Sequence, residues 1–224
     1  MNIQTLLIDA VALIIGIVIH ESAHALAAYL FGDKTARSRG RVSLNPLAHI
    51  DPFGTVLLPL LMLAAGGPVF AFAKPVPVYL NNLKHPKRDE LLVALAGPLS
   101  NVLLALIGAL IGHFLMPALV LQLPMGFLYY LFSFFMTFIV VNLSLAFFNV
   151  IPLPPLDGSS ILVPFLKGKA LQEYYRIQQY AMPILLVILY LLPSVLHIDI
   201  IDMYFDVTVY PLAQGLTSFM VSAI

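Results

Sequence analysis

The sequence predicts an all-α polytopic integral membrane protein with about five or six apolar segments. Of its 224 residues, 61% are hydrophobic and only 10% are charged. A soluble domain carries roughly 45–50% apolar and 25% charged residues. Lys and Arg together number 11, as do Asp and Glu, so there is no basic surplus to neutralise nucleic-acid phosphates. The composition therefore excludes a soluble globular enzyme, a disordered chain and a nucleic-acid-binding protein.

Apolar stretches long enough to cross a bilayer as helices, about 20 residues each, recur along the chain. They lie at about 8–31, 55–73, 92–115, 127–151 and 178–196, with a weaker one at 207–224. We expect Pro211 and Gly215 to break this last stretch. No internal repeat is visible, so we expect a single membrane-embedded domain over 1–224, with 178–224 as accessory segments.

The basic residues are confined to three of the loops between these stretches. They are Lys34, Arg37, Arg39 and Arg41 in the first loop, Lys74, Lys84, Lys87 and Arg88 in the second, and Lys167, Lys169 and Arg176 in the third. The loops at 116–126 and 197–206 contain none. Because cytoplasmic loops are enriched in Lys and Arg, we expect the three basic loops to lie in the cytoplasm and the other two outside.

The stretch 55–73 has a basic loop on each side, so a single crossing would place one of these loops outside. We therefore interpret it as a re-entrant or short β element after the first helix; an ordinary helix with an imperfect charge bias is the alternative. Its prolines and glycines suit a broken element (Pro59, Gly66, Gly67 and Pro68). Irregular backbone at membrane depth is tolerated only where protein or a water-filled cavity covers it, which suggests a cavity here.

The first apolar stretch contains His20-Glu-Ser-Ala-His24, an H-E-x-x-H motif. Residues four apart share one face of a helix, so His20 and His24 can hold one metal ion between their imidazoles. Glu21 lies close enough to take a proton from a water molecule at that ion. Ionisable groups within a membrane helix are costly unless they are paired or bind something. A hydrogen-bonded polar cluster between helices is the structural alternative.

A catalytic zinc ion needs a third protein ligand and an open position for water. Asp157 is a candidate, because it follows the fourth stretch within the sequence N-V-I-P-L-P-P-L-D-G of residues 149–158. The charge distribution places both this segment and the H-E-x-x-H motif toward the cytoplasmic side, so the two can meet. A helix N-cap beside Gly158 is the structural alternative for Asp157.

Together these motifs resemble the site-2 protease family of intramembrane zinc metalloproteases. The resemblance covers about residues 8–165, expected to be the catalytic core, and includes A-G-P-L-S-N at 96–101. It implies that His20, His24 and Asp157 bind one Zn²⁺ ion and that Glu21 is the general base. It also implies that Asn149 binds the peptide or its oxyanion. The segments 39–52 and 73–78 resemble a compact subgroup without PDZ or CBS domains.

The function implied is hydrolysis of a peptide bond within, or at the edge of, the membrane in a transmembrane protein substrate. We expect a multi-pass protein of the cell membrane, in contact with the lipid bilayer, with its active site toward the cytoplasm. A transmembrane substrate must unwind before cleavage, and the stretch 69–80 could hold it extended by strand addition, with Val76 and Val78 in contact. His49 could approach the metal, bind substrate or cap the re-entrant turn; a loop histidine hydrogen-bonded to backbone is the alternative.

Three other functions are compatible with parts of the sequence. A zinc protease of another lineage would use Glu90 or Glu173 as its third ligand, but neither lies in a motif comparable to that of Asp157. A metal transporter would be expected to show internal repeats and paired broken helices. A catalytically silent homologue would bind membrane helices without cutting them. The sequence leaves the substrate's identity and the oligomeric state open.

Overall fold

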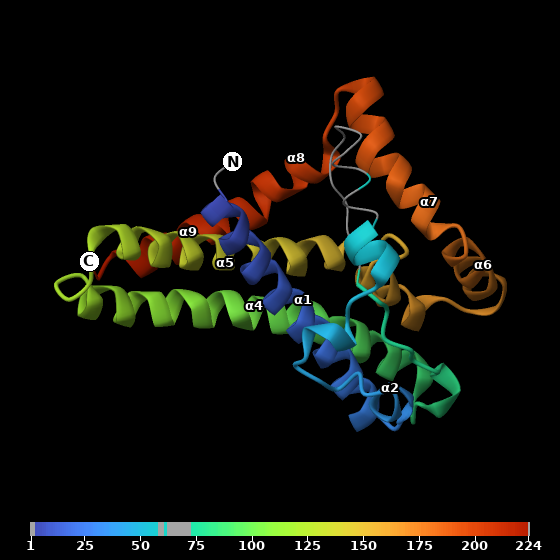
Figure 1. Cartoon of the computed structure of the whole chain (residues 1–224). Coiled ribbons are helices and arrows are strands. Elements are labelled where there is room, and N and C mark those ends of the chain that lie inside the picture. Colours follow the sequence, from blue (N-terminus) through green and yellow to red (C-terminus); the bar gives the residue numbers. More distant parts are fainter. Residues whose placement is uncertain (1–2, 58–60, 62–72, 224) are drawn as a thin grey trace. The chain divides into compact units, whose positions relative to one another are not determined.

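The computed structural model describes residues 3–57, 61 and 73–223, and within these ranges the regular structure is helical (Figure 1). The α-helices are α1 (Ile3–Leu30), α2 (Thr35–Ser38), α4 (Pro86–Leu119), α5 (Met125–Val150), α6 (Gly168–Gln178), α7 (Ala181–Leu186), α8 (Ile200–Val207) and α9 (Val209–Val221). The 3-10 helices are η1 (Pro46–Ala48), η3 (Leu80–Asn82), η4 (Asp157–Ile161) and η5 (Val163–Phe165), and the π-helices are η2 (Pro52–Leu57) and η6 (Val187–Leu196).

Three of these helices, α1, α4 and α5, are long and apolar enough to cross a membrane, each with a mean hydropathy of 2.2. They confirm the expected membrane helices at 8–31, 92–115 and 127–151. Most of the expected re-entrant or β element at 55–73 lies outside the described residues, and 55–57 continue the π-helix η2. The stretches at 178–196 and 207–224 fold as the shorter helices α7, η6 and α9, so a total of five or six segments stays a prediction.

The expected break at Pro211 and Gly215 is wrong, because α9 runs through both residues. Pro211 lies in the first turn of α9, where a backbone N–H has no partner within the helix and its loss costs little. Gly215 is tolerated in the helix interior at a modest cost. The interruption falls instead at Thr208, between α8 and α9.

The chain forms two compact units. The first comprises Met1–Gly16, Pro98–Asn149 and Ile200–Ile224, and the second comprises Ile17–Gly97 and Val150–Asp199. In the first, α4 and α5 lie side by side as a hairpin, and their buried residues share a core with α9 (Figure 1). Small residues permit this close packing: a Cβ atom at Gly112 would lie 2.5 Å from the Met220 sulfur.

A buried pair of asparagines joins the three long helices within the first unit. The Asn101 amide on α4 donates to Gly16 O on α1 at 3.1 Å and to Asn142 Oδ1 on α5 at 2.9 Å. Both asparagines are fully buried, and Asn142 also donates to Phe138 O. Because an unpaired amide is costly in an apolar interior, these bonds fix the register of the helices against one another.

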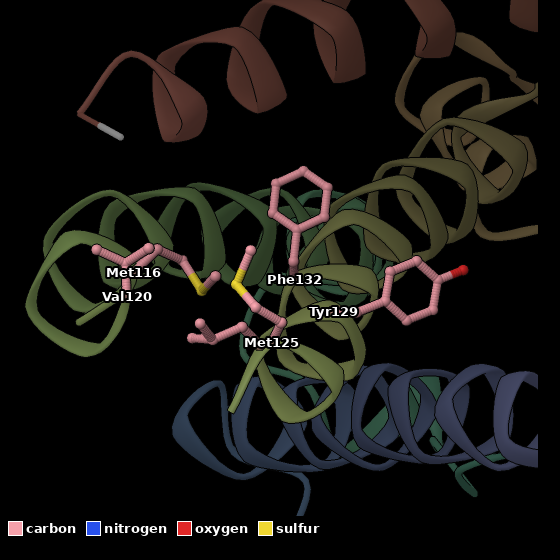
Figure 2. Close-up of a pocket in the computed structure, with 6 residues that line it drawn as sticks. Met116, Val120, Met125, Tyr129 and Phe132 are labelled. Carbon is pink, nitrogen blue, oxygen red and sulfur yellow. The ribbon is translucent and has the colours of Figure 1, made fainter. Parts of the chain in front are cut away.

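An open hollow of about 230 Å³ lies in the same unit, where α4 and α5 approach their connecting turn (Figure 2). Its lining consists of Met116, Val120, Met125, Leu128, Tyr129 and Phe132. None of these side chains is charged at neutral pH, and the thioethers of Met116 and Met125 are soft ligands, unlike the nitrogen and oxygen ligands of a catalytic zinc ion. The hollow therefore has no carboxylate or imidazole to act as an acid, a base or a zinc ligand, and the candidate zinc site lies elsewhere.

In the second unit, Asp33 fastens the end of α1 to the segment that precedes α4. Its buried carboxylate accepts hydrogen bonds from the backbone and hydroxyl of Thr35, from Tyr79 N and from the Asn82 amide, at 2.6–3.0 Å. Burial alone would raise the pKa of Asp33, but these hydrogen bonds favour the charged form more strongly. The pKa therefore lies below its ordinary value of 3.8.

A carboxylate whose pKa is lowered by folding stabilises the fold above its unfolded pKa, and this contribution is lost as the pH falls through the folded pKa. We therefore expect Asp33→Asn to lower the free energy of unfolding at pH 7 by about 1–3 kcal/mol. The difference from wild type should shrink once the pH falls below 3.8. Thermal unfolding of both proteins in detergent, followed across pH, measures this, and a pH-independent difference would contradict it.

Candidate metal centre

The residues of the H-E-x-x-H motif lie on α1, where the helical repeat brings two imidazoles together. His20 and His24 are four residues apart, and their rings are nearly perpendicular with centroids 4.6 Å apart. Both side chains are buried. Two imidazoles on one buried helix face can act as a pair of metal ligands.

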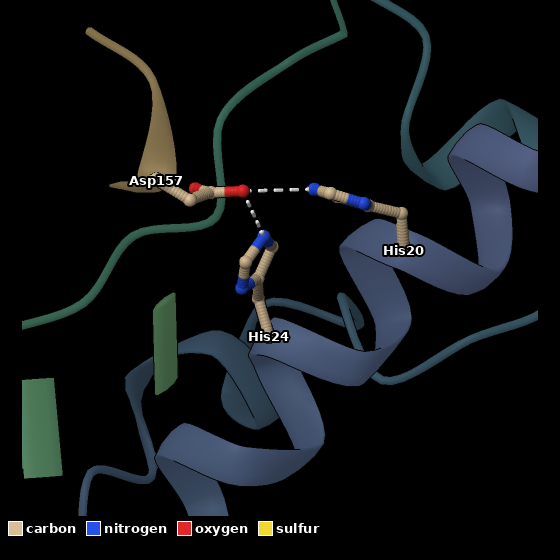
Figure 3. A group of neighbouring side chains, drawn as sticks. All are labelled: His20, His24 and Asp157. Atoms are coloured by element: carbon tan, nitrogen blue, oxygen red, sulfur yellow. Dashed lines mark hydrogen bonds and ion pairs between the residues drawn. The ribbon is translucent and has the colours of Figure 1, made fainter. Parts of the chain in front are cut away.

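Asp157 lies close to these histidines within the second unit, although it follows His20 by 137 residues in the sequence. Its Oδ2 atom lies 3.0 Å from His20 Nε2 and 3.2 Å from His24 Nε2, and the three side chains point toward one another (Figure 3). The ligand atoms of the three residues all lie within 4.8 Å of one another. Two imidazole nitrogens and a carboxylate oxygen are ligand types that zinc accepts, and three protein ligands leave a fourth position open. The group fits a catalytic zinc ion.

The hydrogen bonding of His24 supports this fit. Its Nδ1 atom lies 2.7 Å from the Val93 carbonyl oxygen on α4, a contact that places the proton on Nδ1. The lone pair of Nε2 then faces Asp157 and is free for a metal ion. Metal-binding histidines commonly donate their other ring N–H in this way, which fixes both the tautomer and the ring orientation.

Gly97, one turn along α4 from Val93, leaves the space that the two imidazoles occupy. A Cβ atom at this position would lie 2.4 Å from His24 Nε2 and 2.5 Å from His20 Nε2. Any other residue would push the ligand nitrogens away. In the sequence, Gly97 stood out only as part of the A-G-P-L-S-N match to the site-2 protease family, and no spacing rule could have revealed a contact with residues more than 70 positions earlier.

A second glycine shapes the turn that carries Asp157. The helix α5 ends at Val150, ahead of Pro152, Pro154 and Pro155, and η4 begins at Asp157. A Cβ atom at Gly158 would lie 2.0 Å from the Val150 carbonyl oxygen, which as backbone cannot move aside. This close approach explains why Asp157 is followed by glycine.

Glu21 follows His20 on α1, is partly exposed and lies in the neighbourhood of both histidines and of Asp157. The predicted base therefore lies near the three predicted ligands. Asn149 belongs to the first unit, where its amide donates to Leu145 O at 2.9 Å.

His49 makes the contacts of a loop histidine hydrogen-bonded to backbone. It is fully buried, with Nε2 2.7 Å from Ser43 O and 3.3 Å from the Ser22 hydroxyl. Ser22 lies half a helical turn from His20 and His24, so these contacts hold the 43–49 loop on the face of α1 that points away from the metal group. The neighbouring Arg41 is also buried and donates to Ala48 O and Lys74 O.

Comparison with known proteins identifies the family of this chain. The model of peptidase family M50 matches residues 8–192. The chain belongs to peptidase family M50. This family includes the site-2 proteases, so the resemblance inferred from the motifs is confirmed.

Relatives agree with this assignment. The chain is 40% identical over 178 residues to a protein of Bacillus subtilis (strain 168) named "Putative zinc metalloprotease YwhC". The aligned region covers 80% of this chain and 78% of that protein. Two mycobacterial proteins named Rip2 carry the same description. That of Mycolicibacterium smegmatis is 31% identical over 92% of this chain and 73% of its own length, and that of Mycobacterium tuberculosis (H37Rv) is 30% identical over 81% and 65%. No solved structure matches the chain.

This protein is thus a membrane zinc metalloprotease of family M50. Its cofactor is zinc, as expected, and His20, His24 and Asp157 are the group of described residues that could hold it.

We expect Gly97→Ala to lose bound zinc, because the added methyl group would displace both ligand nitrogens. Gly215→Ala is the matched control, since a Cβ atom at Gly215 on α9 meets nothing within 4 Å. The zinc content of each purified protein, measured by mass spectrometry, tests the expectation, and circular dichroism checks that the helices are retained. One zinc ion per chain in folded Gly97→Ala protein would contradict the close approach at this glycine.

Proposed function

We propose that this protease is a zinc-dependent intramembrane endopeptidase that cleaves transmembrane or membrane-proximal peptide bonds of membrane proteins. One observation carries the proposal: the potential ligand group includes two histidines on α1, a helix of membrane-spanning length and hydropathy, and Asp157 lies 3.0 Å from the first of them. Charged or polar residues within such helices are costly and usually mark a functional site.

In this proposal His20, His24 and Asp157 bind one zinc ion. Zinc, when bound, polarises the scissile carbonyl and lowers the pKa of water toward neutrality. Glu21 takes a proton from the attacking water as its oxygen bonds to the carbonyl carbon. Glu21 then delivers this proton to the amide nitrogen as the C–N bond breaks, so that the amine leaves uncharged and the acid remains.

Asn149 is proposed to donate a hydrogen bond to the substrate peptide or to its oxyanion. Its amide carries two N–H groups and Leu145 O takes one of them, so the other can serve the substrate. A donor aimed at the oxygen where negative charge develops lowers the barrier to attack.

The membrane arrangement we propose has the active site toward the cytoplasmic side of the cell membrane. It rests on the eleven basic residues, all of which lie in the three loops expected to face the cytoplasm. The catalytic core would span about 8–165, with a re-entrant or short β element at 55–73. The segments 178–224 would be accessory parts of a single metalloprotease domain over 1–224, giving five or six apolar segments in all.

A transmembrane substrate must be unwound before cleavage, because its helix occupies every backbone carbonyl in a hydrogen bond. The segment 73–79 could hold such a substrate extended. It has no regular secondary structure and is fastened at both ends. Lys74 N donates to His49 O at 2.9 Å, Lys74 O accepts from Arg41, and Tyr79 N donates to Asp33 at 2.7 Å. His49 and Arg41 would thus hold the first part of the substrate-binding segment in place.

Between these anchors, Val76 and Val78 alternate with Pro75 and Pro77. In an extended chain the backbone groups of alternate residues point to the same edge, so Val76 and Val78 share the edge of Lys74. The prolines have no N–H, which leaves the opposite edge without donors there. Within the described part of the chain, no backbone hydrogen bond is made by Val76 or Val78. A substrate strand could therefore pair with these two valines.

The substitution Glu21→Gln tests the proposed chemistry. We expect it to lower the rate of cleavage of a transmembrane substrate by at least about a hundredfold, since the amide cannot accept the proton, while zinc stays bound. Glu173→Gln, at an exposed position on α6, is the matched control and should cut normally. Cleavage by purified Glu21→Gln protein at the wild-type rate would rule out this mechanism. A wild-type protein that binds helices but cuts none would favour the silent homologue.

The substitution Val78→Pro tests strand addition. Proline fits an extended backbone but removes one N–H, so we expect kcat/KM for a transmembrane substrate to fall about tenfold, the effect of one lost hydrogen bond. Val78→Ala keeps the N–H and should stay within about twofold of wild type. Equal activity of the proline and alanine variants would count against pairing at this edge.

A further inference from the structure

The turn that carries Asp157 is fastened to α6 by a buried hydrogen bond between two hydroxyl groups. Ser159 Oγ lies 3.0 Å from the Tyr174 hydroxyl. Both residues are buried, with exposed fractions of 2% for Ser159 and 7% for Tyr174. Ser159 follows Asp157 by two residues within η4, so a shift of this serine would also move the carboxylate.

A second set of contacts joins the same turn to α6 and to the first turns of α4. The Tyr175 hydroxyl donates to Glu90 Oε2 at 3.0 Å, and Ser160 is hydrogen-bonded to the same carboxylate. Burial, followed by the negative charge of Glu90, raises the pKa of the Tyr175 hydroxyl, which therefore stays protonated and able to donate. Lys87 Nζ adds a bond to Leu166 O at 2.5 Å, beyond the end of η5. Of the two serines that follow Asp157, Ser159 is therefore bonded directly to Tyr174, and Ser160 is linked to Tyr175 through Glu90.

The helix α6 is mostly exposed, and Tyr174 is its buried residue. Most of its side chains are exposed and lie on either side of the two adjacent tyrosines (Lys169, Ala170, Gln172, Glu173, Arg176, Ile177 and Gln178). The Tyr174 hydroxyl bonds Ser159 in the turn, and the Tyr175 hydroxyl bonds Glu90 on α4. Replacing either tyrosine with phenylalanine removes this hydrogen bond and keeps the ring.

We propose that Tyr174 and Tyr175 are positioning residues for the zinc site, which hold the Asp157 turn against the two histidines through Ser159, Ser160 and Glu90. The proposal rests on the proposed role of Asp157 as a zinc ligand. Groups behind a metal ligand that fix its orientation commonly change metal affinity by 10–100-fold when they are removed. The sequence offered no sign of this role, because a pair of tyrosines on a polar helix has no metal-binding spacing.

The experiment measures the zinc affinity of the purified full-length chain by competition with a chromogenic chelator, after the metal has been stripped and returned. We expect Tyr174→Phe and Tyr175→Phe each to weaken zinc binding about tenfold. Tyr180→Phe is the matched control, because Tyr180 follows α6 and is 62% exposed, and its affinity should match wild type. Wild-type affinity in both Tyr174→Phe and Tyr175→Phe would overturn the proposal.

The variant Ser159→Ala removes the same hydrogen bond from its other end and should weaken zinc binding as Tyr174→Phe does. Combining the two should cost no more than either alone, since they share one interaction. Additive losses would overturn the proposed coupling. A lower melting temperature of the zinc-free Tyr174→Phe protein with unchanged zinc affinity would show a merely structural role and would also overturn it.

The variant Asp157→Ala separates this proposal from the one on which it rests. If Asp157→Ala binds zinc as tightly as wild type, the ligand assignment itself fails and the positioning role falls with it. If Asp157→Ala loses zinc while both tyrosine variants keep wild-type affinity, the ligand assignment stands and only the positioning role is refuted.

Discussion

The structure depends on the contact between two buried imidazoles on the long helix α1 and the carboxylate of Asp157 in η4. Polar groups removed from water must find partners, and the cost rises when the surroundings are a membrane. His20, His24 and Asp157 partner one another, with their facing atoms 3.0–3.2 Å apart. A zinc ion among them would satisfy all three at once. The same desolvation that makes the group costly would strengthen its hold on the metal.

The backbone around His20, His24 and Asp157 is shaped to let these three side chains come together. Gly97 provides the space for the imidazole nitrogens, and the Val93 carbonyl one turn earlier fixes the tautomer of His24. Gly158 lets the Asp157 turn pack against the end of α5. The ligands therefore come from two very different supports: a long helix for the histidines and a short, closely packed turn for the aspartate. The turn is bonded to its neighbouring helices through Ser159, which contacts Tyr174 on α6, and Ser160, which contacts Glu90 on α4.

Features that depend on neighbouring residues in the sequence, such as helical spacing, hydropathy and short motifs, could be predicted. The spacing of His20 and His24 required only the helical repeat, and hydropathy alone located α1, α4 and α5. Asp157 was predicted as the third ligand from its motif, and the structure brings it to the histidines. The break at Pro211 was predicted wrongly, because the sequence does not show that this proline falls in the first turn of a helix.

Contacts between distant segments could not be predicted in this way. Nothing in the spacing of the sequence links Gly97 to His20, or Tyr174 to Ser159, because these pairs meet only once the helices have packed. His49 shows the same limit: its loop position allowed several roles, and only the structure shows it bonded to Ser43 and Ser22 on the far face of α1.

X-ray absorption at the zinc edge of the loaded protein tests the central claim most directly. A shell of two imidazole nitrogens and oxygen ligands, at about 2.0–2.2 Å, is the result that the structure predicts. In Asp157→Ala protein, any zinc that remains should keep both imidazoles and lose the carboxylate. Three or more imidazoles in the shell, or a shell that Asp157→Ala leaves unchanged, would contradict the assignment of His20, His24 and Asp157 as the zinc ligands.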